Sequence, residues 1–447
     1  MRKATRKLIT QGINVVLLLT TLFFGVWSTA NVAFGFNVTV TYKHTVLGVM
    51  RNLNEDPLTS AWTKTDDNED LIAGANQYAS VSEFDTGGAV QDDYAISIYG
   101  GTLQFYKDID IVNMRVSDGK IVARLSDSES GFVWTGTRSG EQVDVMTYYP
   151  GHYIKRWQAD GYEYIQLSMW AFDDAVYIAP YYRGTFKSII DTTTYGNAET
   201  TKILRSYASS IPTGSTTIDK FRDYAGNNPN EDNRMSLGDW RDFDFQCLYL
   251  IKYADYNSQT KVGLGITDLY SVQINGLGNA HTTLLGRDGY IGTNGSTSVW
   301  CLGLCDFWGN LFEFIDGITI NSGVACIATN PVNYTNGATS GITGYTNMGY
   351  TNLNSNGYPK ATGYAYNLDN SNSQLIAFAE TSGGSDTTGL CDFHSQDNSL
   401  NARVVLRGGS FYDAYSPAVW SGAFCFYYLN DFTLYTELCG CRLLKTA

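Results

Sequence analysis

The run RGGSFYDAYSPAVWSGAFCFYYLNDFTLYTELCGCRLL occupies residues 407–444 and decides how the chain is interpreted. It opens on a Gly-Gly-Ser turn at 408–410 and closes on the segment 440–444. Aromatic residues crowd between these ends, at Tyr412, Tyr415, Trp420, Phe424, Phe426, Tyr427, Tyr428, Phe432 and Tyr435. Their spacing follows neither the two-residue period of a strand nor the 3.6-residue period of a helix. The run is therefore either an irregular core or a surface rich in contact side chains.

The composition of the whole chain limits its class. The 447 residues are enough for two or three domains, and 43% hydrophobic residues can build a sizeable core. The formal net charge of −14 argues against a protein that tracks nucleic-acid phosphates, because such a protein needs a basic stripe. The 45 Gly and 32 Tyr favour β-structure with long loops, and Tyr is a common contact residue in binding loops. The eight Cys are sparse, and their spacing does not reveal any pairing.

Residues 1–33 have the pattern of a signal peptide. Basic residues in MRKATRK precede the apolar run INVVLLLTTLFFGVW, and small residues follow at 28–33. The apolar run is shorter than the ~20 residues that a membrane-spanning helix needs, so cleavage is the main prediction and an uncleaved anchor is the alternative. A secreted or cell-surface protein follows from this prediction, with a phage virion as the alternative location.

The rest of the chain is predicted to have an α+β layout. Residues 34–104 are predicted to form a small β-rich region, since FNVTVTY from Phe36 alternates as a half-buried strand does. Two helices are expected, in TTIDKFRDYAG at 216–226 and in SLGDWRDFDFQCLYLIKYAD at 236–255. Ser236 and Asp239 stand at capping-box spacing at the start of the second helix. Short strands and long turns are expected after residue 267.

No catalytic constellation stands out in the sequence. The four His residues form no HExxH pair, and no GxSxG, Walker or dinucleotide-binding motif is present. Cys301 and Cys305 lack a second pair at matching spacing, which argues against a structural zinc site. Asp306, Glu313 and Asp316 could supply oxygen ligands to calcium, although such carboxylates more commonly bond to the backbone. We therefore expect no cofactor, with calcium kept as the alternative.

Three stretches together resemble a known family. WGNLFEFIDGI at 308–318 resembles the Gly-Asn-x-x-Glu-x-x-Asp-Gly segment of the formylglycine-generating-enzyme (sulfatase-modifying factor) branch of the C-type lectin fold. VVLRGGSF at 404–411 with GCRLL at 440–444 resembles the C-terminal Arg-Gly-Gly-Ser and Gly-x-Arg signatures of that branch. The segments 143–157 and 248–266 are similar to phage and bacterial proteins of this branch that are diversified by diversity-generating retroelements. The resemblance implies a C-type-lectin-like domain over 105–447.

Within that branch, the resemblance favours a binding protein over an enzyme. The enzymes oxidise a substrate cysteine with a pair of cysteines soon after the Gly-Gly-Ser turn. Here FYDAYSPAVW follows Ser410, and the next cysteine is Cys425. The chain is therefore expected not to be an enzyme. A formylglycine-generating-type oxidase and a virion tail-fibre or adhesin component are the alternatives.

The resemblance also implies that 407–442 is a variable ligand-binding segment. Its fixed frame would be Arg407, Gly408, Gly409, Gly422, Ala423, Gly440 and Arg442. Its ligand-binding residues would be Tyr412, Asp413, Tyr415, Trp420, Tyr427, Tyr428, Asn430, Leu434 and Tyr435. Phe424 and Phe426 are expected in the core. The expected function is to bind a protein or glycan on a target surface, with no nucleic-acid partner and no membrane contact beyond the N-terminal segment.

Overall fold

The computed structural model describes residues 29–30, 40–41, 46–52, 54, 62–65, 103–127, 129–227, 235–276, 295–321, 324–328, 330–335, 344–347, 359–364, 377–382, 392, 394–396, 403–412, 421–428, 431 and 433–446. Almost all of the predicted signal peptide, and most of the predicted region 34–104, lie outside these residues. The described chain is mostly β with few helices. No helix in this part of the chain is both long and apolar enough to span a membrane.

One antiparallel sheet joins residues from both sides of the predicted boundary at 104. Its strand order is β11 (Val176–Ile178), β9 (His152–Ala159), β10 (Tyr162–Ser168), β3 (Leu47–Asn52) and β4 (Trp62–Lys64). In the pairing of β3 with β10, Val49 stands opposite Ile165, and both side chains are fully buried. This part of the predicted N-terminal region is therefore built into a sheet of the residues that follow it.

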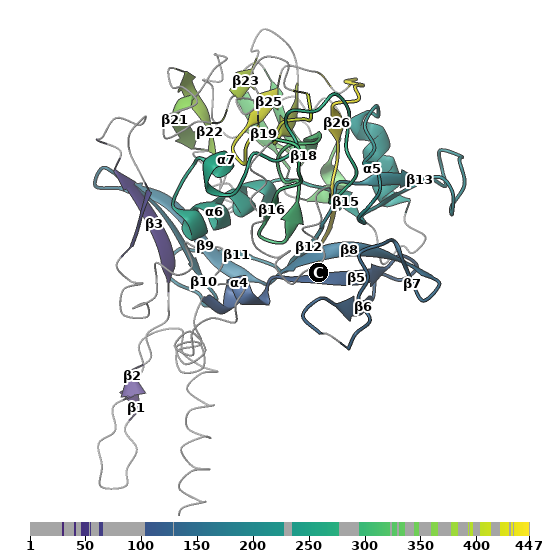
Figure 1. Cartoon of the computed structure of the whole chain (residues 1–447). Helices are drawn as coiled ribbons and strands as arrows, with labels where there is room; N and C mark the ends of the chain where they lie inside the picture. The colour runs from purple at the N-terminus through teal and green to yellow at the C-terminus, as the bar shows by residue number, and fades with distance from the viewer. Residues whose placement is uncertain are drawn as a thin grey trace, which may run out of the picture.

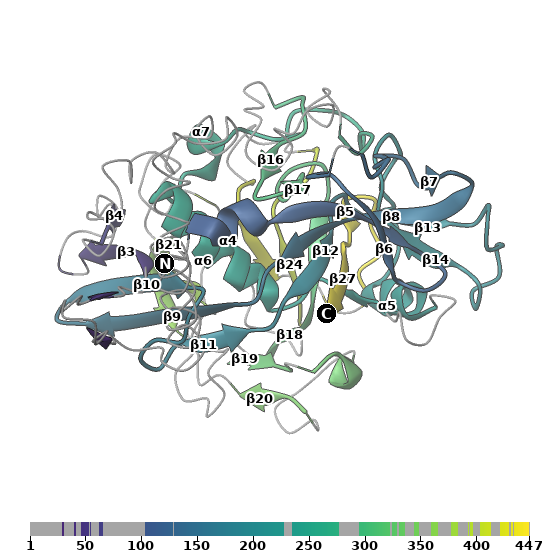
Figure 2. The same cartoon turned by 90° about the horizontal axis from the view of Figure 1, so that it is seen from below.

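A second sheet lies beside the first, as the view from below shows (Figure 2). Its strand order is β15 (Ser236–Leu237), β27 (Leu443–Thr446), β12 (Tyr181–Gly184), β8 (Glu141–Tyr149), β5 (Asp110–Arg115) and β6 (Ile121–Arg124), and β7 (Thr137–Arg138) also pairs with β8. The C-terminal strand β27 thus lies between strands that are distant from it in sequence.

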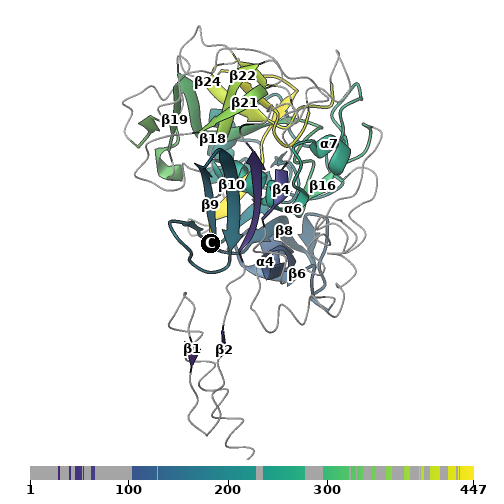
Figure 3. The same cartoon turned by 90° about the vertical axis from the view of Figure 1, so that its left-hand side faces the viewer.

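A third sheet carries the run quoted at the outset. Its order is β20 (Thr346–Asn347), β19 (Val324–Ile327), β18 (Phe312–Asn321), β24 (Arg403–Arg407), β25 (Phe426–Tyr428) and β23 (His394–Gln396), and β26 (Cys439–Gly440) pairs in parallel with β18. Figure 3 shows β18, β19 and β24 above β9 and β10. Short two-stranded pairs complete the described strands: β1 (Thr29–Ala30) with β2 (Val40–Thr41), β13 (Ile189–Asp191) with β14 (Ile203–Arg205), β16 (Trp300–Cys301) with β17 (Leu304–Cys305), and β21 (Pro359–Tyr364) with β22 (Ala377–Ser382).

The core centres on the helix α6 (Arg241–Tyr253), which lies between the first sheet and the third (Figure 1). All 13 residues of α6 are buried. Its apolar side chains share one cluster with Ile165 of β10, Ile315 of β18 and Phe426 of β25. The other described helices are α4 (Leu103–Asp108), α5 (Ile218–Gly226), α7 (Ser258–Lys261) and the 3-10 helix η6 (Pro331–Asn333).

Both predicted helices are present, but the predicted start of the second is wrong. The helix predicted at 216–226 is α5. Ser236 does not cap α6, because it pairs with Leu444 in the short strand β15, and α6 begins only at Arg241. Asp239 accepts a hydrogen bond from the Arg241 N–H at 3.1 Å and pairs with the Arg241 side chain at 2.6 Å. Strand pairing at Ser236 therefore replaces the local capping that the spacing indicated.

Candidate binding face and its frame

The turn after β24 is built from two glycines in left-handed backbone conformation. Gly408 has φ of 88° and Gly409 of 82°, a region that side chains with a Cβ rarely adopt. A Cβ at Gly408 would lie 2.7 Å from the carbonyl oxygen of Phe307. Gly309 donates to the Gly408 carbonyl at 2.8 Å, and Gly408 donates to Cys425 at 3.1 Å. The turn thus needs glycine for its conformation and for its close contact with the loop before β18.

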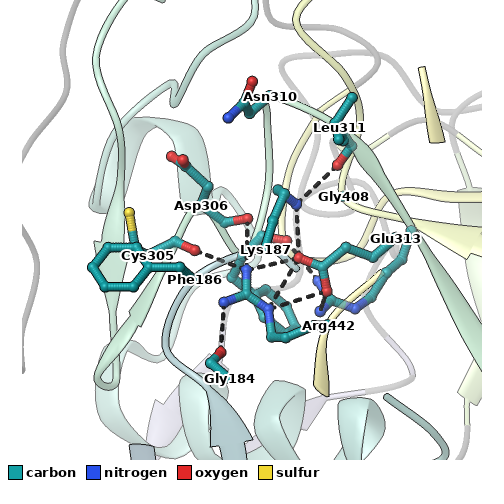
Figure 4. Close-up of polar contacts among 12 residues, drawn as sticks. Gly184, Phe186, Lys187, Cys305, Asp306, Asn310, Leu311, Glu313, Gly408 and Arg442 are labelled. Carbon is teal, nitrogen blue, oxygen red and sulfur yellow. Dashed lines mark hydrogen bonds and ion pairs between the residues drawn. The ribbon is translucent and has the colours of Figure 1, made fainter. Parts of the chain in front are cut away.

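The two arginines that flank the run converge on one carboxylate, Glu313 of β18. Arg407 and Arg442 are both fully buried. The Arg442 guanidinium pairs with Glu313 at 2.7 Å and donates to the carbonyl oxygens of Gly184 at 2.8 Å and of Cys305 at 2.7 Å (Figure 4). Arg407 pairs with Glu313 and with Asp242 of α6, and it donates to the Phe307 carbonyl at 2.5 Å. The two ends of the run are therefore held by ion pairs to the same buried carboxylate, that of Glu313.

A third cation, Lys187, also points at Glu313 (Figure 4). Its Nζ lies 2.7 Å from Glu313 Oε1 and 2.8 Å from the Leu311 carbonyl oxygen. Burial lowers the pKa of Lys187 to about 8, even though Glu313 acts in the opposite direction. Burial alone would raise the pKa of Glu313, but the attraction of Arg407, Arg442 and Lys187 outweighs it and holds that pKa well below its usual range. Glu313 is thus an ionised group surrounded by cations.

The three carboxylates considered as calcium ligands each have separate protein partners. Asp306 accepts hydrogen bonds from Ser298 Oγ at 3.1 Å and from the Val299 N–H at 3.2 Å, and burial raises its pKa to about 6. Asp316 pairs with Arg222 of α5 at 2.7 Å. Across the described ranges, no group of three or more His, Cys, Asp or Glu side chains is arranged to hold a metal ion.

The predicted contact residues that the structure describes fall into two kinds. Tyr412 is 49% exposed and Tyr435 is 68% exposed. Tyr427 and Leu434 are half-buried and pack on the core cluster of Phe312, with the Tyr427 and Phe312 ring centroids 5.6 Å apart. Tyr428 belongs to β25, and the structure does not describe its side chain. Asp413, Tyr415, Trp420 and Asn430 lie outside the described residues.

The predicted core residues and frame positions of the run can also be placed. Phe426 is buried and its ring stacks on Phe243 of α6 at 5.3 Å, which confirms its predicted place in the core. Phe424 is only partly buried and packs against the same core cluster. Ala423 is fully buried, and a Cβ on Gly440 would lie 2.8 Å from the Leu311 side chain. The positions predicted as a frame are thus closely packed.

The segment 268–275, which was not predicted as part of the site, lies beside the run. Asp268 forms an antiparallel bridge with Tyr412, and the Leu269 N–H donates to the Phe411 carbonyl at 3.0 Å. Tyr270, on this segment, is 96% exposed. Periodicity gives no signal here, because the contact joins loops that are more than 140 residues apart in the sequence.

The cysteines of the described chain are buried thiols. Cys247, Cys301, Cys305, Cys326, Cys425, Cys439 and Cys441 are all free and buried. Burial raises the pKa of the Cys439 and Cys441 thiols well above the ordinary value. These two groups therefore stay protonated at neutral pH, whereas the thiolate is the reactive form of cysteine.

Comparison with known proteins places the chain near few others. No protein-family model matches it. No curated protein matches it either. Solved structures similar to this chain include the "Major Tropism Determinant U1 Variant" and the "Major Tropism Determinant M1 Variant", each with 14% sequence identity and a TM-score of 0.26. Each match covers 75% of this chain and 71% of the other.

Proposed function

We propose that this chain is a ligand-binding protein that displays a diversified, Tyr-rich face on a C-type-lectin-like fold. The ligand would be a protein or glycan on the surface of a cell or particle. One observation carries the proposal: Arg407 and Arg442, near the two ends of the run, are fully buried, while Tyr412 and Tyr435 between them are about half and two-thirds exposed. The sequence resemblance of 308–318, 404–411 and 440–444 to retroelement-diversified proteins supplies the reason to expect variation between these anchors.

The physical basis of such a face is a separation of roles. Ion pairs buried around Glu313 hold the backbone ends of the run, so exposed side chains can change without loss of the fold. Exposed Tyr side chains provide large and rigid contact area at low entropic cost, as they do in antibody loops. Affinity would come from aromatic anchors, and specificity from the polar residues between them.

Two features support binding over oxidase chemistry on this frame. The ten residues after Ser410 contain no cysteine. The cysteines that follow within the run, Cys425, Cys439 and Cys441, are buried, and burial favours the protonated thiol at the last two. A turnover assay with a Cys-containing peptide and oxygen should therefore show no oxidation of the peptide.

We further propose a secreted or cell-surface location, on the basis of the N-terminal pattern at residues 1–33. Mass spectrometry of the N-terminus tests this location, because the mature chain should begin after Ala30 or after Ala33. An intact N-terminus in purified phage particles would instead assign the protein to a virion.

The DNA that flanks the coding region gives a test of diversification that needs no ligand. We expect a reverse-transcriptase gene and an imperfect copy of the 407–442 coding segment, with mismatches concentrated at adenines of the copy. The mismatches should fall at codons such as those of Tyr412 and Tyr435 and spare those of Arg407 and Arg442. Flanking DNA without such a copy would contradict the proposed diversification.

A further inference from the structure

We infer that the segment 268–275 is a constant part of the binding face, and that the face takes a protein surface rich in Lys and Arg. This inference rests on the proposed function, since it names an additional contact segment and a partner chemistry for the same face. The segment lies outside 407–442, so its residues would not change when the variable residues do.

The segment 268–275 is attached directly to the run. Besides the bridge between Asp268 and Tyr412, Leu269 packs on a small cluster formed by Ile266, Leu311 and Phe411. Leu438, which precedes β26, packs on the same cluster. The beginning and the end of the run thus meet the segment through one shared hydrophobic contact.

Hydrogen bonds fix the backbone of the segment. The side chain of Asn310 accepts from the Gln273 N–H at 2.9 Å and donates to the Gln273 carbonyl at 3.1 Å. Asn275 donates from its N–H to Ser210 at 2.8 Å and from its side chain to the Lys187 carbonyl at 2.9 Å. A segment held in this way is ordered before a ligand arrives, which lowers the entropic cost of binding.

Exposed apolar side chains gather on the segments that meet here. The segment 209–215 joins this region through the Ser215 N–H, which donates to Thr436 at 2.7 Å, and through Ser209, which donates to Asn275 at 3.0 Å. Of the seven large hydrophobic side chains that are exposed in the described chain, five lie on these neighbouring segments: Ile211, Tyr270, Ile274, Tyr412 and Tyr435. Single exposed apolar residues are ordinary, but a group on adjoining segments marks an interaction surface.

The negative charge of the same segments favours a positively charged partner. Asp268, Asp431 and Glu437 are exposed. The sequence has no Lys or Arg between Arg407 and Arg442, between Lys261 and Arg287, or between Arg205 and Lys220. An acidic surface attracts a cationic partner at long range and repels an acidic one. Tyr rings add direct contacts for Lys and Arg through their faces.

Binding of the full chain to three immobilised peptides tests the inference. The peptides share a Gly-Ser-Tyr background and carry Lys and Arg, only Ser, or Glu at the same positions. We expect the Lys/Arg peptide to bind most tightly, and its Kd to rise when NaCl is increased from about 50 mM to about 300 mM, because salt screens exposed charges. Equal binding of the three peptides, or no binding of the Lys/Arg peptide at low salt, would overturn the basic partner.

Matched variants separate contact at the face from general attraction to an acidic chain. Tyr270→Ser should raise the Kd of the Lys/Arg peptide about two- to fivefold. Tyr177→Ser, which removes a Tyr that is 53% exposed on the first sheet, should leave the Kd unchanged. Asp268→Asn should weaken binding more than Asp174→Asn, although each removes one exposed negative charge. Equal effects within either pair would overturn the role of the segment.

Two further variants distinguish this inference from the proposed function. If Tyr412→Ser and Tyr435→Ser weaken binding and Tyr270→Ser does not, the variable face stands and its extension over 268–275 is wrong. If none of the three changes the Kd, the face itself is misplaced. Binding to an array of neutral glycans, without binding to the Lys/Arg peptide, would replace the partner class and leave the face in place.

Discussion

Glu313 shows how single residues hold this molecule together. Its carboxylate is buried and contacts the side chains of Arg407, Arg442 and Lys187. Buried charges are costly unless they are paired, so removal of one member leaves others uncompensated. Removal of the Arg442 side chain should cost the most stability. Its guanidinium also donates hydrogen bonds to the carbonyl oxygens of Gly184, Thr185 and Cys305, which would lose their donor. The conformation of the run therefore depends on residues that no ligand would touch.

Glu313→Gln should destabilise the fold by about 3–5 kcal/mol, because three buried cations would lose their common counter-charge. Urea unfolding at pH 7 measures the change, and Glu141→Gln, at an exposed position, is the control. The folded-state pKa of Glu313 is depressed, so its contribution is present above the ordinary pKa of 4.5 and is lost as the pH falls through the folded-state value. A Glu313→Gln variant as stable as the control would contradict the account.

Asp306 should have the opposite dependence on pH. Burial raises its pKa from 3.8 to about 6, so its contribution to stability is fully present below pH 3.8 and is lost as the pH rises through 6. Asp306→Asn removes this titration. Between about pH 4 and pH 7, the stability of the variant relative to the native chain should therefore rise by about 2 kcal/mol. Unfolding curves at several pH values give this difference, and parallel stability profiles would show that Asp306 does not titrate in this range.

At the scale of elements, β24 and β25 present the run, and the turn after Arg407 sets the direction in which the chain leaves the sheet. Gly408 is held on both sides, by Gly309 and by Cys425. Tyr427 of β25 is half-buried and packs on Phe312 of β18, and Leu434 of the following loop packs on the same core cluster, while Tyr435 is exposed. Within the run, some side chains therefore pack into the core, and others in the same short stretch face solvent.

Gly408→Ala should lower the free energy of unfolding by about 1–2 kcal/mol or more. The left-handed conformation alone accounts for about that cost, and the contact with the Phe307 carbonyl adds to it. Gly226→Ala is the matched control, because a Cβ there meets nothing within 4 Å. Thermal melting of the two variants gives the comparison. The same melting temperature in both would mean that the turn is not constrained as described.

Tyr427 and Tyr435 should respond differently to the same substitution. Tyr435→Ser should change stability by less than about 0.5 kcal/mol, as is usual for exposed positions. Tyr427→Ser should cost about 1–2 kcal/mol, because it removes a half-buried ring from Phe312. Differential scanning calorimetry of both variants measures this. If Tyr427→Ser melted like the native chain, Tyr427 would belong with the exposed contact residues.

Local patterns in the sequence predicted local features. The helix at 216–226, the existence of α6, the turn at Gly408 and the buried Phe426 all follow from residue type and short-range spacing. Two other features depend on contacts between residues that are distant in sequence, so short-range spacing could not predict them. Ser236 pairs with Leu444 instead of capping α6, and Asp268 forms a bridge with Tyr412. The pairing of Glu313 with three cations likewise depends on residues that are distant from it in sequence.

At the scale of the whole molecule, the charged network around Glu313 gathers residues from α6, from the third sheet and from the ends of second-sheet strands. Asp242 belongs to α6, Glu313 to β18 and Arg407 to β24, while Arg442 directly precedes β27 and Lys187 follows β12. Because α6, the second sheet and the third sheet meet at this network, loss of either arginine should disturb the packing of these three parts together. The exposed residues of the run make no comparable contribution. Under the proposed function, this separation would let the exposed residues vary while the core stays the same.

The most direct test of this separation is the unfolding free energy of two sets of full-length variants. One set replaces Tyr412 and Tyr435 with varied residues, and the other replaces Arg407 and Arg442. We predict that the Tyr set stays within about 0.5 kcal/mol of the native chain, and that the Arg set loses at least about 3 kcal/mol. Overlapping distributions of unfolding free energy in the two sets would contradict a fixed frame that carries a changeable face.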